Sequence, residues 1–308
     1  MKTETKAILA LLVTTLIWGM APVCTRLLAV ELKPANALVI RYAAVTLIFA
    51  AVLAWTGGWR IDLRDWPRLL FISLIGMLGY NLGSVYGFEL APASIGGLIV
   101  GTQPLLILLV AAAVAQESPR AATIAGVAIA TIGTVLLFWN DLHFAAGRTD
   151  MLRGAVLIFL SGVAWAFYVV GAKPLIERYG ALTVSGGSII IATLPMLALG
   201  SSETVSALAG MTAVEWGAMA FMVILSTFVA SITWNYGAGH LPAAAAGPFL
   251  YLVPVLAVAA GAAILDEPVS ANILAGGALI LTGVAVAEFG GRARIARLRQ
   301  KQGTKSPV

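Results

Sequence analysis

Residues 84–106 read SVYGFELAPASIGGLIVGTQPLL, and residues 234–256 read WNYGAGHLPAAAAGPFLYLVPVL. The two stretches start 150 positions apart and carry the same glycines, prolines and tyrosine at corresponding places. The shared positions are Tyr86 and Tyr236, Gly87 and Gly237, Pro92 and Pro242, Gly97 and Gly247, and Pro104 and Pro254. A pattern that recurs at a fixed distance along an apolar chain indicates an internal duplication.

The correspondence continues on both sides of the quoted stretches. At a spacing of 150 the chain pairs Trp66 with Trp216, Phe71 with Phe221, Glu117 with Glu267, Gly126 with Gly276 and Gly133 with Gly283. At a slightly smaller spacing Trp18 pairs with Trp165, and Arg26 pairs with Lys173. The repeated unit therefore covers nearly half of the chain.

The composition is that of a membrane protein. The 308 residues are 60% hydrophobic and only 11% charged, whereas soluble domains carry about 25% charged residues. Because a membrane-spanning helix needs roughly 20 apolar residues, hydropathy predicts ten spans and leaves almost no room for a soluble domain. The ten spans lie near 7–29, 35–56, 67–88, 92–115, 119–139, 152–172, 181–200, 214–238, 242–265 and 270–290.

An odd number of spans in each copy makes the second copy enter the membrane from the opposite face. We therefore predict an all-α integral membrane protein, with ten transmembrane helices arranged as two inverted five-helix repeats around a central cavity. The first repeat covers 1–145, the second covers 146–291, and a basic tail covers 292–308. Inverted repeats are typical of transporters that alternate access around a site at the bilayer midplane.

The positive charges predict that both ends of the chain are cytoplasmic. Of the 19 lysines and arginines, 14 fall on the side of the N-terminus, four on the other side, and one, Arg41, inside a span. Positive residues favour the cytoplasmic side, so loop 116–119 is expected inside and loop 266–269 outside. We interpret the tail GRARIARLRQK as an anchor on an anionic leaflet and not as a nucleic-acid site.

Several of these residues resemble the drug/metabolite transporter superfamily, specifically its EamA-type, ten-helix members. The resemblance covers nearly the whole chain, and its second-half motifs repeat those of the first. The matching residues are Trp18-Gly19, Arg41-Tyr42, Tyr86, Pro92, Pro104, Glu117, Gly126 and Gly133, with Tyr236, Pro242, Pro254, Glu267, Gly276 and Gly283 in the second half. The resemblance implies export of small metabolites across the bacterial inner membrane, and it is greatest to aromatic amino-acid exporters of the YddG type.

Polar and aromatic groups inside the spans are the candidates for substrate binding, because such groups are rare and expensive in lipid. They suggest an aromatic-walled cavity for a neutral, partly apolar solute, and a ring can also hold an ammonium group. On span three, Tyr80 shares one helical face with Gly76, Gly83, Ser84 and Gly87, which predicts a gap beside its hydroxyl. The candidates are Trp18, Tyr80, Asn81, Ser84, Tyr86, Gln103, Trp165, Tyr168, Trp234, Tyr251 and Arg41.

Two questions stay open at this point. Each ring near mid-span, such as Trp18 or Trp165, either lines the cavity or packs against neighbouring helices. Arg41 is either a counter-ion for a substrate carboxylate or a link to helix carbonyls. Pro104 and Pro254 lie inside spans four and nine, where proline removes a backbone hydrogen bond, so we predict hinges at Pro104, Pro254 and Gly101.

The sequence predicts neither a cofactor nor a metal. His143 and His240 have no cysteine or carboxylate cluster around them, no phosphate-binding loop motif occurs, and no catalytic dyad is evident, so we do not expect an enzyme. No Asp or Glu falls at mid-span, which predicts facilitated transport or exchange without tight proton coupling. We expect a monomer in lipid with a small-molecule substrate; the alternatives are a broad drug or nucleotide-sugar carrier and, outside transport, an intramembrane enzyme.

Overall fold

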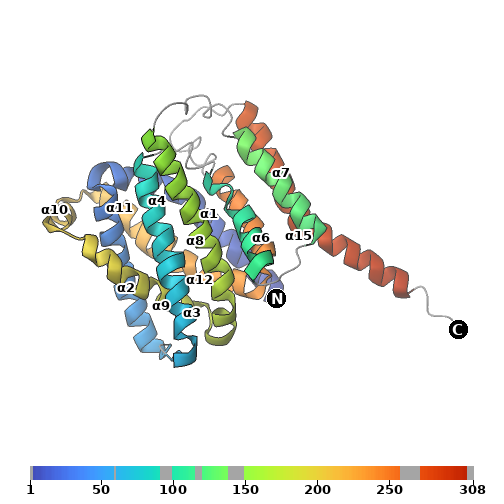
Figure 1. Cartoon of the computed structure of the whole chain (residues 1–308), viewed down its shortest axis with the longest axis horizontal. Coiled ribbons are helices and arrows are strands. Elements are labelled where there is room, and N and C mark those ends of the chain that lie inside the picture. Colours follow the sequence, from blue (N-terminus) through green and yellow to red (C-terminus); the bar gives the residue numbers. More distant parts are fainter. Residues whose placement is uncertain are drawn as a thin grey trace.

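The computed structural model describes residues 3–58, 60–90, 99–114, 120–137, 149–256 and 271–303, and the elements in these ranges are all helical. In the first half, α1 (Thr3–Leu32) and α2 (Pro34–Thr56) are followed by one rod built from α3 (Trp66–Phe71), the π-helix η2 (Ile72–Leu78) and α4 (Gly79–Leu90). A short 3₁₀ turn, η1 (Leu63–Asp65), precedes this rod, and α6 (Gln103–Val114) and α7 (Ala121–Leu137) complete the half (Figure 1).

The second half repeats this order. It contains α8 (Thr149–Tyr179), α9 (Ala181–Met196), the short η4 (Leu197–Leu199) and α10 (Ser202–Gly210). A second rod follows, made of α11 (Ala213–Ala220), the π-helix η5 (Phe221–Val229) and α12 (Ala230–His240). The chain then forms α13 (Ala243–Ala246), the 3₁₀ turn η6 (Gly247–Tyr251) and the long α15 (Ala271–Gly303).

Six helices in the described part of the chain are long and apolar enough to cross a membrane. They are Thr3–Ala21, Pro34–Thr56, Leu63–Leu90, Leu152–Tyr179, Ala181–Leu199 and Ala213–His240. Four shorter apolar helices, Gln103–Val114, Ala121–Leu136, Gly247–Leu256 and Ala271–Ala287, fall within the other four predicted spans. The protein is therefore a multi-pass helical membrane protein, and the count of ten spans stays a prediction.

Local sequence signals set the helix ends. Pro34 begins α2, where its missing N–H would have no partner in any case. Gly57 ends the helix with a φ of 66° and donates its N–H to the Leu53 carbonyl. At the start of α11, the Thr212 hydroxyl accepts from the Glu215 N–H while Glu215 accepts from the Thr212 N–H, which is a capping box.

The two π-helices fall at matched positions of the duplication. Ile72, the first residue of η2, corresponds at a spacing of 150 to Met222, the second residue of η5. A π-turn is rare and is frequent at functional sites. Its occurrence at the same place in both rods is a structural match that hydropathy does not reveal.

Close helix packing also recurs in matched pairs. A Cβ on Gly87 of α4 would lie 2.5 Å from Ile158 Cγ1 and 3.0 Å from the Gly154 carbonyl of α8. A Cβ on Gly237 of α12 would lie 2.5 Å from Leu11 Cγ and 3.0 Å from the Ala7 carbonyl of α1. Glycines therefore let α4 approach α8, and α12 approach α1, to distances that any larger residue would prevent.

The helices α7 and α15 form a separate antiparallel pair at one side of the bundle (Figure 1). A Cβ on Gly283 would lie 2.5 Å from the Gly126 carbonyl, and a Cβ on Gly133 would lie 2.7 Å from the Gly276 carbonyl. Farther along, α15 extends to Gly303, so the backbone of the predicted tail continues the last helix.

Two local predictions need correction. The small-residue face of span three leaves no gap beside Tyr80, because a Cβ on Gly76 would meet Tyr168 at 2.7 Å and one on Gly83 would meet Ser161 at 3.1 Å. Pro104 does not lie inside a helix but is the second residue of α6, after a turn at Gly101 and Thr102. The helix is already interrupted before Pro104, and the proline removes no helical hydrogen bond there.

Candidate functional site

Five ring side chains meet in the interior of the bundle, and we call them the aromatic cluster: Trp18 of α1, Tyr80 of α4, Trp165 and Tyr168 of α8, and Trp234 of α12. The Trp165 ring is central, with its centroid 5.1 Å from Tyr80, 5.3 Å from Tyr168, 5.7 Å from Trp18 and 5.9 Å from Trp234. Trp18 and Trp234 are 5.4 Å apart. These separations are those of attractive ring pairs.

Helices from both halves of the chain supply the aromatic cluster. The two glycine-mediated contacts described above, α4 on α8 and α1 on α12, bring the four backbones together. Trp234 is 1% exposed and Trp165 is 6% exposed. Tyr168 is also buried, whereas Trp18 and Tyr80 are half-buried, so these rings pack against one another.

Hydrogen bonds fix part of the cluster. The Asn235 amide donates to the Tyr168 hydroxyl and to the Ser185 hydroxyl of α9, both at 2.7 Å. The Trp18 indole N–H donates to the Ser226 carbonyl in η5 at 3.0 Å. Each of these donors thus has an acceptor inside the protein, as buried polar groups usually do.

Among the described residues, three other N–H donors of this region have no acceptor, and Ser188 Oγ of α9 also has no partner. The three donors are Trp165 Nε1, Trp234 Nε1 and Gln103 Nε2. Gln103 is 4% exposed and its side chain lies beside Tyr80, so it adjoins the cluster. Buried donors without a partner are rare and cost free energy.

Two adjacent residues of α2 reach both π-helices. Arg41 Nε donates to the Thr227 hydroxyl at 2.6 Å, and that hydroxyl donates to the Met222 carbonyl within η5. The Tyr42 hydroxyl donates to Asn81 Oδ1 at 2.8 Å, and the Asn81 amide donates to the Met77 carbonyl within η2.

This geometry bears on both roles considered for Arg41. Its partner in the structure is the Thr227 hydroxyl, and its guanidinium carbon lies 5.4 Å from the Tyr42 ring centroid. It contacts a helix carbonyl only through that hydroxyl. None of the ion pairs found among the described residues involves Arg41.

The remaining candidates lie elsewhere. Tyr251 is fully buried, but its hydroxyl pairs with Thr131 of α7 at 2.7 Å, on the side of the α7–α15 pair. Tyr86 is exposed at the far end of α4, and Ser84 is half-buried one turn beyond Tyr80. The motif positions Pro92, Gly97, Glu117 and Glu267 lie outside the described residues.

Sequence reasoning did not place three residues of this network in the site: Tyr42, Ser185 and Thr227. Tyr42 belongs to the Arg41-Tyr42 motif, so its position beside an intramembrane charge was an available signal. Ser185 and Thr227 are small polar residues on apolar helices. Only the packing of α9 and the π-turn of η5 show that they face the interior.

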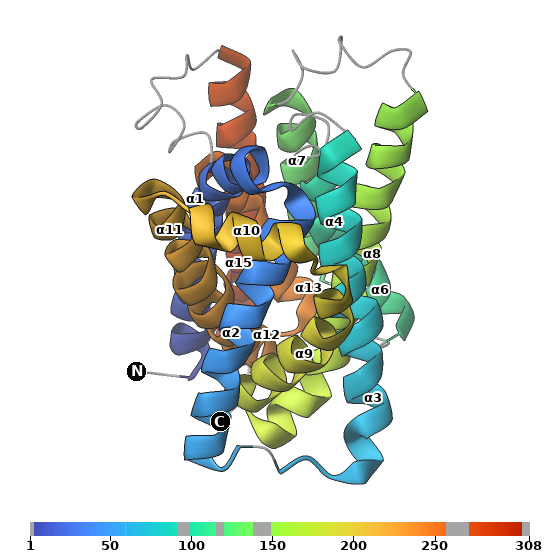
Figure 2. The same cartoon turned by 90° about the vertical axis from the view of Figure 1, so that its left-hand side faces the viewer.

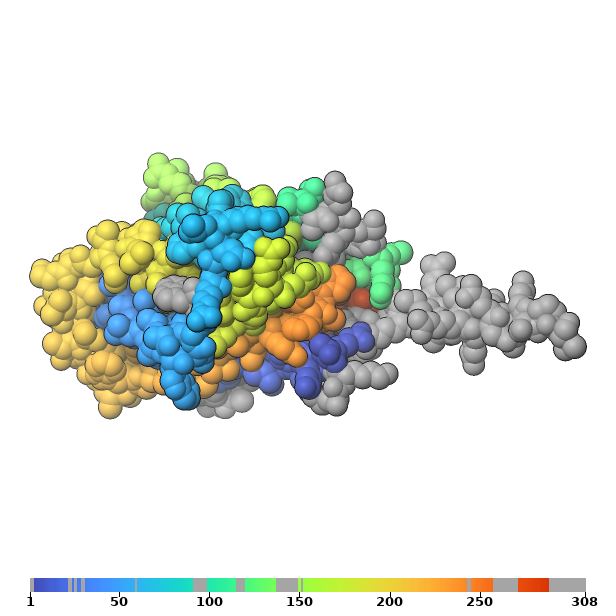
Figure 3. All heavy atoms as spheres, turned by 90° about the horizontal axis from the view of Figure 1, so that it is seen from below, coloured from blue at the N-terminus to red at the C-terminus, as the bar shows by residue number. Residues whose placement is uncertain are grey.

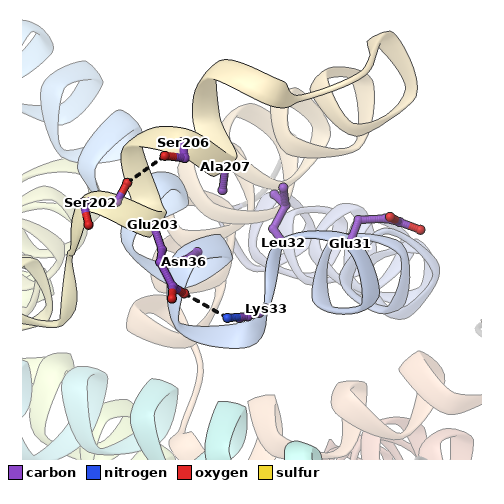
Figure 4. Close-up of a pocket in the computed structure, with 8 residues that line it drawn as sticks. All are labelled: Glu31, Leu32, Lys33, Asn36, Ser202, Glu203, Ser206 and Ala207. Atoms are coloured by element: carbon purple, nitrogen blue, oxygen red, sulfur yellow. Dashed lines mark hydrogen bonds and ion pairs between the residues drawn. The ribbon is translucent and has the colours of Figure 1, made fainter.

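Contacts between the halves also occur at both ends of the bundle. At the end near the α1–α2 turn, Lys33 Nζ lies 2.9 Å from Glu203 of α10, beside a surface pocket of about 280 Å³ (Figure 4). At the opposite end, Arg178 pairs with Asp65 at 2.5 Å and Tyr179 donates to the same carboxylate at 2.6 Å. Figure 2 shows α10 across the upper part of α2 and the α2–α3 connection at the lower end of the bundle, which Figure 3 shows from below.

The comparisons with known proteins give the family. The model of the EamA-like transporter family matches residues 5–139 and again residues 152–289. An uncharacterized transporter of Archaeoglobus fulgidus is 26% identical over 90% of this chain and 96% of its own. A probable terminal-alkyne amino-acid exporter of Streptantibioticus cattleyicolor is 26% identical over 91% of this chain and 92% of its own.

A probable amino-acid metabolite efflux pump of Salmonella typhimurium is 24% identical over 77% of this chain and 86% of its own. A solved crystal structure superposes with a TM-score of 0.75 at 24% identity and covers 94% of this chain and 98% of that one, which shows a shared fold. Because the family model accounts for most of the sequence in two successive segments, the chain belongs to the EamA-like transporter family and is a membrane transporter.

Proposed function

We propose that this transporter exports amino acids with apolar, chiefly aromatic, side chains, or closely related metabolites, by alternating access. The observation that carries the proposal is the aromatic cluster, in which buried rings from both halves of the chain meet. A wall of rings with a few hydrogen-bonding groups suits a partly apolar solute. The names of the Streptantibioticus and Salmonella relatives support amino acids as the substrate class.

We further propose that the halves are inverted repeats with boundaries at 1–145 and 146–291. The contact between Gly126 and Gly283 has a counterpart in the contact between Gly276 and Gly133, because Gly126 matches Gly276 and Gly133 matches Gly283 in sequence. A two-fold axis perpendicular to two antiparallel helices produces this correspondence. The matched contacts of Gly87 and Gly237 support the same axis.

Alternating access needs points where a helix bends, and we propose Gly101, Pro104 and Pro254 for this role. Gly101 lies in the turn before α6, and Pro254 lies three residues after the 3₁₀ turn η6. Both matched helices are therefore irregular beside the matched prolines. We also propose that transport is facilitated diffusion or exchange, in a monomer with both ends in the cytoplasm of a bacterial inner membrane.

Uptake of labelled L-phenylalanine into proteoliposomes tests the proposed function. Unlabelled aromatic amino acids are expected to compete, and Trp165→Ala or Tyr80→Ala is expected to reduce the rate at least tenfold while the protein stays folded. Normal uptake in both variants would remove the aromatic cluster from the transport path.

Tags in loops 116–119 and 266–269 test the inverted arrangement of the two repeats. We expect the two tags on opposite sides of the membrane, and accessibility of both from one side would contradict the inversion.

A broad drug or nucleotide-sugar carrier is the alternative transport function. A nucleotide sugar carries phosphates, which need several cationic groups, and the described part of the site supplies only Arg41. Competition by a nucleotide sugar in the uptake assay, stronger than that of L-phenylalanine, would favour this alternative.

A further inference from the structure

We propose that the aromatic cluster recognises the carboxylate end of its substrate through Gln103, Trp165 and Trp234, and that it does not read the ammonium end. This inference rests on the proposed function, because it takes the aromatic cluster to be the substrate site. The ordinary expectation for a site built from tryptophans is attraction of a cation to the ring faces. The hydrogen-bonding groups around these rings point to the opposite preference.

The buried N–H donors around the cluster outnumber their acceptors in the part of the chain that the structure describes. Trp165 Nε1, Trp234 Nε1 and Gln103 Nε2 are buried and have no acceptor among the described residues. The neighbouring donors of Trp18 and Asn235 are all paired. Since an unpaired buried donor destabilises the protein, three of them around one pair of touching rings indicate that an acceptor arrives from outside.

The assignment of the glutamine amide does not change this excess. The Tyr80 hydroxyl and the Gln103 amide are neighbours and together offer three hydrogens. If the amide oxygen faces Tyr80, both amide hydrogens are free, and if the amide nitrogen faces Tyr80, the phenolic O–H is free. Either way, the pair presents donors to a ligand.

The formal charge that acts on the cluster is positive. The guanidinium of Arg41 acts electrostatically on Tyr80; it lies on α2 beside Tyr42 and is hydrogen-bonded to Thr227 of η5. No carboxylate is found among the partners of the cluster residues in the described ranges. A cationic ligand would find no counter-ion there, whereas a carboxylate has four lone-pair sites to accept these donors.

Two probes separate the ends of an aromatic amino acid: 3-phenylpropionate keeps the ring and the carboxylate, and phenethylamine keeps the ring and the ammonium. Quenching of tryptophan fluorescence in the detergent-solubilised protein measures the binding of each. We expect 3-phenylpropionate to bind at least tenfold more tightly, since hydrogen bonds to a charged group are the strong ones. Equal affinity, the reverse order, or binding of neither probe would overturn the inference.

A substitution that removes only donors sharpens the test. Gln103→Met keeps the volume and removes the amide, so we expect the affinity for 3-phenylpropionate to fall about tenfold, with phenethylamine unchanged and the melting temperature equal or higher. Trp234→Phe provides the same test if Gln103→Met fails to fold. As the control, Trp18→Phe removes an indole N–H that already has its acceptor; it should lower the melting temperature and affect both probes equally. An unchanged preference in both test variants contradicts the assignment.

The outcomes also separate this inference from the proposed function. Uptake of L-phenylalanine with a preference for phenethylamine would reject the carboxylate assignment and leave the function standing. A preference for 3-phenylpropionate without any uptake of amino acids would reject the function and keep the assignment.

Discussion

Replacement of Gly283 by alanine tests the close contact between α7 and α15. The new Cβ would lie 2.5 Å from the Gly126 carbonyl and 2.6 Å from the Ala130 N–H nitrogen, both backbone atoms. Ordinary contact begins near 3.4 Å, so the helices must separate by about 0.9 Å, and overpacking of this kind costs about 1–3 kcal/mol. Alanine regains about 1 kcal/mol of helix propensity, which leaves an expected net loss of about 0–2 kcal/mol and a protein about 1–3 kcal/mol less stable than an alanine variant without the contact.

The free energy of unfolding, measured by denaturant titration of the protein in detergent micelles, gives the result. Gly277→Ala is the matched control on the same helix, because its Cβ would meet nothing within 4 Å, and we expect it to be neutral or stabilising. Gly133→Ala, at the counterpart of Gly283, should cost a similar amount, since its Cβ would meet the Gly276 carbonyl at 2.7 Å. A Gly283→Ala protein as stable as Gly277→Ala would refute the packing argument.

Three further outcomes are expected. The hydroxyls of Thr14 of α1 and Thr233 of α12 are 2.7 Å apart. A double-mutant cycle with valine at both positions should give a coupling free energy of about 0.6 kcal/mol. Zero coupling would show that this hydrogen bond does not stabilise the contact between the helices. Gly57→Ala places a side chain at a φ of 66° and should destabilise by about 1 kcal/mol in thermal melts; no loss would contradict the left-handed helix end. The hydrogen bond from Lys33, and then its charge, lower the pKa of Glu203 from 4.5. This pair therefore stabilises the fold above pH 4.5, and its contribution disappears as the pH falls through the lowered pKa. Glu203→Gln should flatten the acid side of the plot of stability against pH, and an unchanged plot would contradict this.

The sequence was sufficient to predict the helical class. The rings of Trp18, Tyr80, Trp165, Tyr168 and Trp234 were among its eleven candidates, and their role in substrate binding stays a prediction. Hydropathy locates helices in lipid, and paired motifs show which helices are related. The sequence was not sufficient to predict where side chains point in the 3₁₀ and π segments, where the helical periodicity changes. Tyr251 is the last residue of the 3₁₀ turn η6, and its hydroxyl pairs with Thr131 of α7. Thr227 lies in the π-helix η5, and its hydroxyl accepts from Arg41.

Packing decided the other differences. The face of Gly76 and Gly83 predicted a gap, but small residues in a membrane also invite a neighbouring helix, and α8 fills the space. The same sequence is compatible with an open gap and with a closely packed neighbouring helix. Only the position of α8 distinguishes them.

The adjacent residues Arg41 and Tyr42 of α2 connect the π-helices of the two halves. Arg41 is hydrogen-bonded to η5 through Thr227, and Tyr42 is hydrogen-bonded to η2 through Asn81. Because both hydrogen bonds come from adjacent residues of α2, a change of conformation in either π-helix would have to break one of them or move α2, which the other half also holds.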